Sequence, residues 1–223
     1  MPWTMDCGPW TFFYLYPMNQ QLPMFPGEPS SHQVPLKNGL LEYYPQFFST
    51  GEADTLFREL TQDIHWKQES MKMYGKTVLF PRLMAWHGDA GSAYAFSGTT
   101  YTPEPWTPAL LQIKEKIEPP AGVHFNSVLL NLYRNGKDAM GWHADDEPEL
   151  GANPVIASVN FGAARRFMLR YKQDHALKYE LELQHGSLLL MKGTLQHYWQ
   201  HQVPKTARLL PSRINLTFRV INP

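Results

Sequence analysis

The sequence predicts an α+β fold in which helices pack on a C-terminal barrel of two β-sheets, a sandwich or jelly roll. After Pro120, six short runs rich in β-branched and aromatic residues follow one another at roughly ten-residue spacing, which is typical of such double sheets. Before Pro120, two segments have the apolar spacing of amphipathic helices. We therefore expect strands at residues 128–133, 155–161, 167–171, 179–183, 187–191 and 214–220.

The two expected helices have recognisable ends. The run from Ser49 places a hydroxyl cap and early acidic residues before an apolar face that includes Leu56 and Leu60. Thr107 and Pro108 open the second helix, and Pro119 and Pro120 are expected to end it. Residues 70–101, between the helices, contain glycines that separate short β-rich runs, the pattern of hairpins and loops.

The length of 223 residues suits one large domain. Residues 1–35 hold seven prolines and show no periodic pattern, so we expect an extended N-terminal arm. Residues 36–120 are expected to hold the helices and hairpins, and residues 121–223 the barrel, in one compact domain from about residue 36 to 223.

Composition excludes several classes of protein. One cysteine permits neither an intramolecular disulfide nor a cysteine metal cage. The single cysteine also indicates a reducing, cytoplasmic location. No segment approaches the roughly 20 apolar residues that cross a bilayer, so we expect no membrane association. We further expect a monomer. Lys+Arg 20 balances Asp+Glu 20, which argues weakly against nucleic-acid binding, but residues 165–178 and 205–219 are locally basic.

The last expected strand carries a polar face. Side chains alternate across a strand, so four polar residues point one way while apolar residues point the other. A solvent-facing strand gives the same alternation, but paired arginines could equally grip a dianion inside a barrel. The four polar residues are Arg213, Asn215, Thr217 and Arg219.

His143 and Asp145 form an H-x-D pair whose side chains project together from extended backbone. One imidazole and one carboxylate are two thirds of the 2-His-1-carboxylate triad of non-haem Fe(II) oxygenases. On spacing alone, His185, His197 or His201 could supply the third ligand. Asn131 and Tyr133, two apart on an earlier strand, would add an amide and a phenol to the same wall.

Taken together, these motifs resemble the ordered signature of the AlkB family of Fe(II)/2-oxoglutarate dioxygenases, over about residues 65–221. The matching pieces are 131–133, 143–145, 200–204 and the alternating 213–219 strand. The resemblance implies a double-stranded β-helix, His201 as third metal ligand, and Fe(II), 2-oxoglutarate and O2 as cofactor and cosubstrates. It also implies that Arg213 pairs with the distal carboxylate of 2-oxoglutarate, in a pocket completed by Asn131, Tyr133, Asn215, Thr217 and Arg219.

Residues 73–98 resemble the nucleotide-recognition lid of the DNA-repair members, closest to the duplex-acting branch. Tyr74 on a hairpin tip is similar to an intercalating wedge, and Tyr94 and Phe96 would stack on a flipped base, although they could merely cover one strand face. Trp86 and His87 follow in the same lid, His87 standing where relatives often have tyrosine. Phosphates would be met by Arg82, Arg165 and Lys172.

Asp146 and Glu147 directly follow the H-x-D pair. A solvated acidic loop is one interpretation. In the resembling family such acids read the base, because a carboxylate accepts a hydrogen bond from the exocyclic amine of adenine or cytosine, and we favour Glu147 for this role.

The resemblance implies oxidative demethylation of bases such as 1-methyladenine and 3-methylcytosine in DNA, duplex or single-stranded, with release of formaldehyde, succinate and CO2. RNA is a further candidate partner. The location would then be the nucleoid in a bacterium or the nucleus in a eukaryote. One alternative keeps this chemistry on RNA, protein or a small molecule. Another is a jelly-roll module that binds a metal and catalyses nothing. The polar face of residues 213–219, which is suited to bind a dianion, argues against this alternative.

Overall fold

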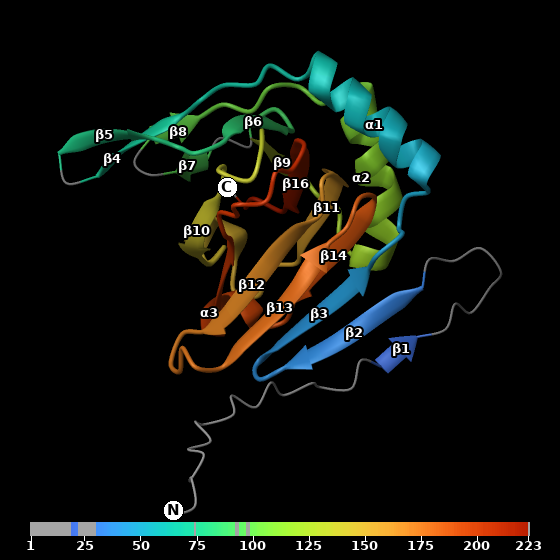
Figure 1. The fold of residues 1–223 in the computed structure, drawn as a ribbon, viewed down its shortest axis with the longest axis vertical. Helices are drawn as coiled ribbons and strands as arrows, with labels where there is room; N and C mark the ends of the chain where they lie inside the picture. The colour runs from blue at the N-terminus through green and yellow to red at the C-terminus, as the bar shows by residue number, and fades with distance from the viewer. Residues whose placement is uncertain (1–18, 22–29, 74, 92–93, 97–98, 223) are drawn as a thin grey trace, which may run out of the picture.

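The computed structural model describes residues 19–21, 30–73, 75–91, 94–96 and 99–222, and for 19–21, 73, 94–96 and 99–101 it describes the backbone alone. Two antiparallel β-sheets pack face to face, with two helices against the outer face of the larger one (Figure 1). This is the jelly roll with flanking helices that the sequence predicts.

Among the described residues, eight strands form the large sheet, in the order β1-β2-β3-β14-β11-β16-β9-β6. Every neighbouring pair in it is antiparallel. Its strands are β1 (Asn19–Gln21), β2 (Ser31–Leu36), β3 (Gly39–Tyr44), β6 (Leu83–Gly88), β9 (Ser127–Tyr133), β11 (Ile156–Gly162), β14 (Ser187–Lys192) and β16 (Arg213–Arg219).

The smaller sheet has the order β10-β15-β12-β13, from β10 (Met140–His143), β12 (Arg165–Tyr171), β13 (Lys178–Leu183) and β15 (Trp199–Val203). Two hairpins stand apart from both sheets: β4 (Ser70–Met73) with β5 (Lys76–Leu79), and β7 (Tyr94–Phe96) with β8 (Thr99–Tyr101). The β4–β5 hairpin projects from the body of the protein (Figure 1). All six strands expected after Pro120 are present, whereas β10 and β15 were not expected.

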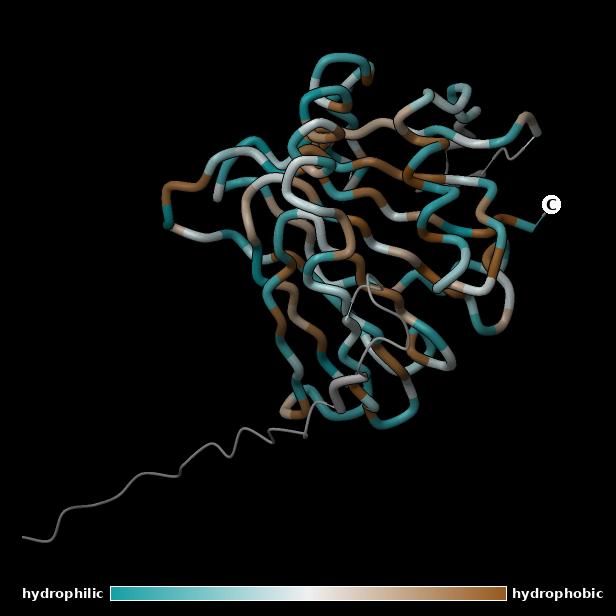
Figure 2. Tube along the Cα trace, turned by 90° about the vertical axis from the view of Figure 1, so that its right-hand side faces the viewer, coloured by the Kyte–Doolittle hydropathy of each residue, from teal (hydrophilic) through white to brown (hydrophobic). Residues whose placement is uncertain are grey.

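Two hydrophobic clusters hold these layers together. One packs α1 (Thr50–Asp63) and α2 (Pro108–Ala121) on the large sheet through residues such as Leu56, Leu110 and Phe218. The other fills the space between the two sheets with residues such as Leu169 and Trp199. Hydrophobic stretches follow the strands and hydrophilic ones gather at the outer turns (Figure 2). Among the helices described, none has the length and apolar run needed to cross a bilayer.

The helix ends partly follow the expectation. Ser49 and Glu52 form a reciprocal capping box at the start of α1. Pro119 and Pro120 do not end α2, because both lie inside its last turn. The helix ends instead at Gly122, whose φ of 74° turns the chain into the left-handed region, where its N–H donates to the Glu118 carbonyl at 2.8 Å.

The N-terminal segment contributes more to the sheet than an arm would. β2 covers residues 31–36, pairs with β3, and buries Val34 in the core between the sheets. The compact domain therefore begins before residue 36. Residues 1–18 of the expected arm lie outside the described residues.

Candidate metal centre and its two pockets

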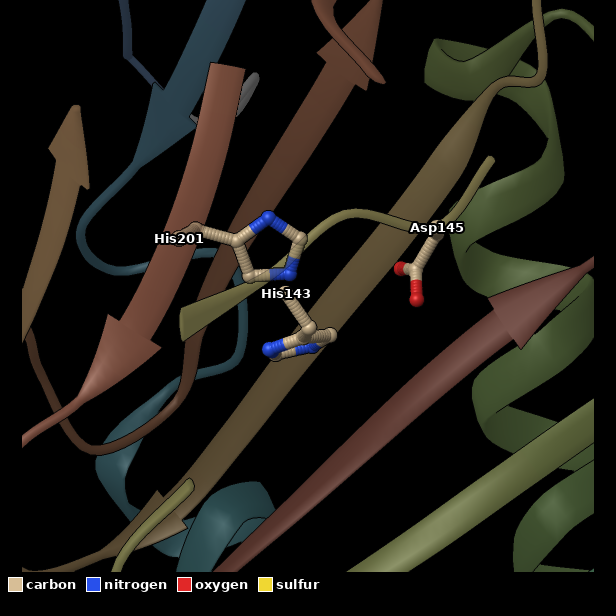
Figure 3. Close-up of side chains that lie close together, drawn as sticks. All are labelled: His143, Asp145 and His201. Atoms are coloured by element: carbon tan, nitrogen blue, oxygen red, sulfur yellow. The ribbon is translucent and has the colours of Figure 1, made fainter. Parts of the chain in front are cut away.

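Two adjacent strands of the smaller sheet bring two histidines together. His143 ends β10 and His201 lies in β15, and the two are direct cross-strand partners. Their ring centroids are 4.2 Å apart, and Asp145 follows from the loop after β10 (Figure 3). Ligand atoms of the three side chains all lie within 4.8 Å of one another. We call His143, Asp145 and His201 the metal cluster.

The other candidate histidines have different partners. His185 Nδ1 accepts a hydrogen bond from the Gly162 backbone N–H at 2.8 Å. His197 Nε2 contacts the Ala152 carbonyl. Within the part of the chain that the structure describes, only His201 completes a cluster with His143 and Asp145, as the resemblance implies.

The protonation states in the metal cluster suit a divalent cation. Burial, reinforced by nearby His143, lowers the pKa of His201 to about 3, so this imidazole is neutral. Burial alone would raise the pKa of Asp145, but Arg219 and the two histidines outweigh it and hold this pKa at about 2. Asp145 is therefore ionised at neutral pH. A neutral His201 imidazole and an ionised Asp145 carboxylate are donors of the kind that the facial triad uses.

Hydrogen bonds orient these ligands. His143 Nδ1 lies 2.9 Å from the Gly141 carbonyl, which can only accept, so Nδ1 donates and Nε2 is the ring nitrogen that this hydrogen bond leaves available. The Asp145 backbone N–H donates to Gln196 Oε1 at 3.0 Å. Asp145 Oδ1 accepts from Arg219 at 2.7 Å, while the buried Oδ2 has no hydrogen-bond partner in the described structure. That oxygen is available to a metal ion.

A buried cation lies deeper in the barrel. Arg213, 1% exposed, donates from Nη2 to Asn160 Oδ1 at 2.5 Å, and its buried Nε and Nη1 have no hydrogen-bond partner among the described residues. Burial lowers its pKa to about 10, against the opposing effect of Tyr133, so the guanidinium stays charged at neutral pH. A buried charge is costly without a counter-charge. The arrangement fits a carboxylate-bearing ligand.

Between Arg213 and the metal cluster lies a small inner pocket. The polar face of β16 lines it, with side chains from β9 on one side and β11 on the other. Tyr133 lines the pocket and packs against Arg213, its ring centre 4.9 Å from the guanidinium carbon. Besides the metal cluster, its lining includes Asn131, Tyr133, Ser158, Asn215, Thr217 and Arg219. Thus β16 faces a ligand pocket rather than solvent.

A second, larger cavity of about 590 Å³ opens on the other side of the metal cluster. His143, Asp145 and Arg219 line both spaces. The large cavity also has Met84, Trp86, Trp142 and Glu147 in its wall. Trp86 is fixed by a 2.8 Å hydrogen bond to Ser127 Oγ, and Glu147 has a buried Oε2 without a hydrogen-bond partner among the described residues. A second ligand could reach the metal cluster from here.

Comparison with known proteins identifies the family. The model of the 2OG-Fe(II) oxygenase superfamily matches residues 40–219. The chain is 41% identical over 195 residues to the DNA oxidative demethylase ALKBH2 of Mus musculus, covering 83% of this chain and 82% of the relative. The chain belongs to the AlkB family. It is also 44% identical over 188 residues to the alpha-ketoglutarate-dependent dioxygenase alkB homolog 3 of Bos taurus, covering 80% of this chain but 65% of that relative.

The chain thus spans less than two thirds of the length of the alkB homolog 3 relatives from cattle, human, rat and mouse. The solved structure of OsALKBH1 has the same fold, with a TM-score of 0.57 at 18% identity, over 84% of this chain and 99% of that one. The family implies Fe(II) and 2-oxoglutarate. The metal cluster fits the first, and the inner pocket with Arg213 fits the second.

Sequence reasoning missed part of the inner pocket. Asn160 and Ser158 lie on β11, opposite Asn215 and Thr217 of β16. Asn215 Nδ2 donates to Ser158 Oγ at 2.8 Å, and Asn160 holds Arg213. The sequence did contain a signal for these two residues, because they are polar, lie at alternate positions and interrupt an otherwise apolar strand. Gln196, which holds the Asp145 backbone, had no comparable signal.

Two of the residues expected at phosphates are buried. Arg165 is 3% exposed and donates to the carbonyls of Asn135, Asp138 and Pro204 at 2.7–3.2 Å. Its guanidinium is therefore hydrogen-bonded inside the protein. Arg82 is 2% exposed and donates to Asn131. A phosphate on the surface cannot reach either side chain as they stand. Both expectations are corrected, because local positive charge in a sequence does not show which cations face solvent.

Three residues expected near the base or the phosphates have other contacts. His87 is buried outside the lining of the large cavity, with Nδ1 2.6 Å from the Pro105 carbonyl, so it does not face a base there. Asp146 is likewise absent from that lining and pairs with Lys172 at 2.7 Å. Lys172 also donates to the Gln196 carbonyl at 2.9 Å, so it holds the metal-site loop.

The lid residues are described in part. Trp86 and Glu147 line the large cavity, and contact of either residue with a base stays a prediction. Tyr94 and Phe96 lie on β7, but their side chains lie outside the described part of the chain, and so does Tyr74 entirely. The wedge and the stacking pair stay predictions.

Proposed function

We propose that this protein is an Fe(II)- and 2-oxoglutarate-dependent dioxygenase that removes N-linked methyl groups from bases such as 1-methyladenine and 3-methylcytosine in DNA. One observation carries the proposal. The metal cluster lies between a large cavity, where Glu147 has a buried carboxylate oxygen without a hydrogen-bond partner among the described residues, and a polar inner pocket. Near this pocket, against Tyr133, lies a buried arginine, Arg213, with two N–H groups unsatisfied and no counter-charge among the described residues. An anionic cosubstrate and a base can therefore approach one metal from two sides.

The overall reaction consumes one O2 and one 2-oxoglutarate, yields succinate and CO2, and hydroxylates the N-methyl carbon. The resulting hemiaminal breaks its C–N bond to give formaldehyde and the repaired base. O2 is the oxidant in this balance, and Fe(II), when bound, would supply the chemistry that activates it. The chain supplies positions and charges, as follows.

Each part of the site has a distinct task. His143, Asp145 and His201 would hold the metal. Arg213 binds the distal carboxylate of 2-oxoglutarate, since its guanidinium can donate two hydrogen bonds to one carboxylate. Arg219 keeps Asp145 ionised and in place.

The large cavity would receive the base. Glu147 Oε2 would accept a hydrogen bond from an exocyclic amine, which adenine and cytosine have. Trp86 and Trp142 offer aromatic surface in the cavity wall and exclude water. A base inside a duplex must be flipped out to reach this depth, which is the task assigned to Tyr74 as a wedge.

DNA as the substrate is favoured by the relatives named DNA oxidative demethylase, from mouse and human among others. RNA is the second candidate, since the relatives named alkB homolog 3 are at least as similar in sequence and their names specify no DNA. A non-catalytic metal module is disfavoured, because a structural metal site has no use for the charge of Arg213. We further propose that the protein is a monomer. Its location would be the nucleoid in a bacterium or the nucleus in a eukaryote.

The test is a comparison of substrates. Purified protein with Fe(II), ascorbate and 2-oxoglutarate is given methylated single-stranded DNA, duplex DNA or RNA oligomers, and formaldehyde and succinate are measured. We expect both products in equal amounts with DNA. Asp145→Ala and His201→Ala should abolish turnover, whereas the exposed His197→Ala should retain most of it.

Each result has a clear meaning. Formaldehyde from RNA but not from DNA would reassign the substrate. Full turnover by Asp145→Ala in iron-replete buffer would show that Asp145 is not a required metal ligand. Loss of duplex activity alone in Tyr74→Ala would support the wedge, because stacking on an aromatic contributes on the order of 1–3 kcal/mol per base.

A further inference from the structure

Arg82 is a buried cation that the proposed mechanism does not use. It directly precedes β6 and is 2% exposed. Its Nε donates to Asn131 Oδ1 at 2.6 Å, while its other hydrogen bond, from Nη1 to the Ala139 carbonyl, is long at 3.5 Å. The guanidinium also packs on the Phe80 ring, 4.9 Å from its centre. The short bond to Asn131 is thus its dominant polar contact.

The sheet register explains how these two residues meet. Leu83 of β6 is opposite Leu132 of β9, and Met84 is opposite Asn131. Residues two apart share a face, so Arg82 and Asn131 lie on the same face of neighbouring strands, in diagonal positions that long side chains can bridge. Arg82 lines the large cavity, whereas Asn131 lines the inner pocket. The pair therefore joins the two ligand spaces.

The pairing fixes the orientation of an amide. A guanidinium nitrogen can only donate, so the Asn131 atom that faces Arg82 must be the oxygen. The Asn131 NH2 group is then the branch turned away from Arg82. Without Arg82 the amide could rotate and present its oxygen to the pocket, where it would repel an anionic ligand.

We propose that Arg82 is a positioning residue that holds the Asn131 amide with its NH2 group directed to 2-oxoglutarate in the inner pocket. This inference rests on the proposed function, because it assumes that 2-oxoglutarate binds there. Arg82 would act through Asn131 and would not contact the cosubstrate itself.

Arg165 shows what a purely structural arginine looks like in the same protein. It has the same degree of burial, but its bonds go to backbone carbonyls of three loop residues. Arg82, in contrast, makes its short bond to a side chain that lines the pocket. A contact that served only to satisfy a buried charge would not require a side-chain amide at that position.

The experiment measures binding of 2-oxoglutarate by calorimetry to protein loaded with Mn(II), without nucleic acid. For Arg82→Met, which keeps the length but removes the donors, we expect the dissociation constant for 2-oxoglutarate to rise about tenfold, the loss of one charge-assisted hydrogen bond. Affinity for Mn(II) alone should be unchanged. Lys205→Met is the matched control, an exposed cation of the same large cavity, and should leave 2-oxoglutarate affinity unaltered.

A double-mutant cycle with Asn131→Ala separates positioning from general structure. If Arg82 acts through Asn131, Arg82→Met adds nothing once the amide is gone. Full additivity of the two effects would overturn the inference, and so would wild-type affinity in Arg82→Met.

Two further outcomes are distinguishable. If Arg82→Met does not fold, Arg82→Gln replaces it, with a smaller rise expected in the same direction, and wild-type affinity in folded Arg82→Gln counts against the inference. If the unmodified protein fails to bind 2-oxoglutarate, the proposed function itself fails, not merely the role of Arg82.

Discussion

Arg213 shows how one residue can indicate a ligand. Burying a guanidinium is costly, and proteins usually offset the cost with a carboxylate. Here its described neighbours are the Asn160 amide, the Tyr133 ring and a second cation, Arg165. The local field is positive, so an incoming anion removes an unfavourable interaction as well as forming new hydrogen bonds.

The corresponding prediction concerns Arg213→Lys. Lysine keeps the charge but loses the planar pair of donors, so the apparent KM for 2-oxoglutarate should rise roughly tenfold or more, while the KM for the oligonucleotide changes little. Arg166→Lys is the control, because Arg166 is exposed on β12 of the smaller sheet and pairs with Glu180 at 2.6 Å. Equal rises in both constants would contradict the assignment of Arg213 to the cosubstrate.

At the scale of elements, the start of α1 is tied to α2 by one carboxylate. Glu52 closes the capping box with Ser49 and also pairs with Lys116 of α2 at 2.7 Å. The hydrogen bond from Lys116, with those from Ser49, lowers the pKa of Glu52 to about 2. The two helices that cover the large sheet therefore share a pH-sensitive contact.

This contact predicts the acid behaviour of Glu52→Gln. A carboxyl group whose pKa is lower in the folded state stabilises the protein above its unfolded pKa of 4.5, and loses that contribution as the pH falls toward 2. At pH 7 the variant should be less stable than wild type, by at most about 1 kcal/mol because the pair is exposed. Urea titrations at pH 7, 4 and 3 should show this difference shrinking. A constant difference would mean that the charge of Glu52 is not involved.

The elements also show what sequence could and could not predict. β16 and β11 were predictable, because alternation and apolar runs are local properties of strands. β10 and β15 were not, since each is short, mixes Trp and His with Gly or Gln, and is defined by its pairing partners. His201 lies on β15, so its spacing alone left three candidates, and the family resemblance selected it.

The second limit of prediction from sequence was that it did not show which charged side chains are buried. Residues 165–178 look like a basic surface in the sequence, yet Arg165 is interior and Lys172 holds the loop after the metal ligands. Whether an arginine faces solvent depends on carbonyls supplied by residues far along the chain. No local pattern encodes that.

For the molecule as a whole, the ligand site lies where its layers meet. The metal ligands come from the smaller sheet and the loop after β10, whereas the inner pocket draws its polar face from β9, β11 and β16 of the larger sheet. Metal and cosubstrate together would therefore contact both sheets. Ligands that bind only the folded state stabilise it.

The whole-molecule prediction is a rise in melting temperature. With Mn(II) saturating and 2-oxoglutarate at 100 times its dissociation constant, linkage gives roughly 2.7 kcal/mol of added stability. For a chain of this size, that corresponds to a rise in Tm of roughly 5–10 °C, measurable by calorimetry. Arg213→Lys at the same 2-oxoglutarate concentration should show about half of that rise or less, since a tenfold weaker affinity leaves roughly 1.4 kcal/mol, although its response to Mn(II) alone should match wild type. An undiminished response to 2-oxoglutarate in that variant would show that the cosubstrate binds away from the inner pocket, because a ligand stabilises the fold only through the contacts it makes.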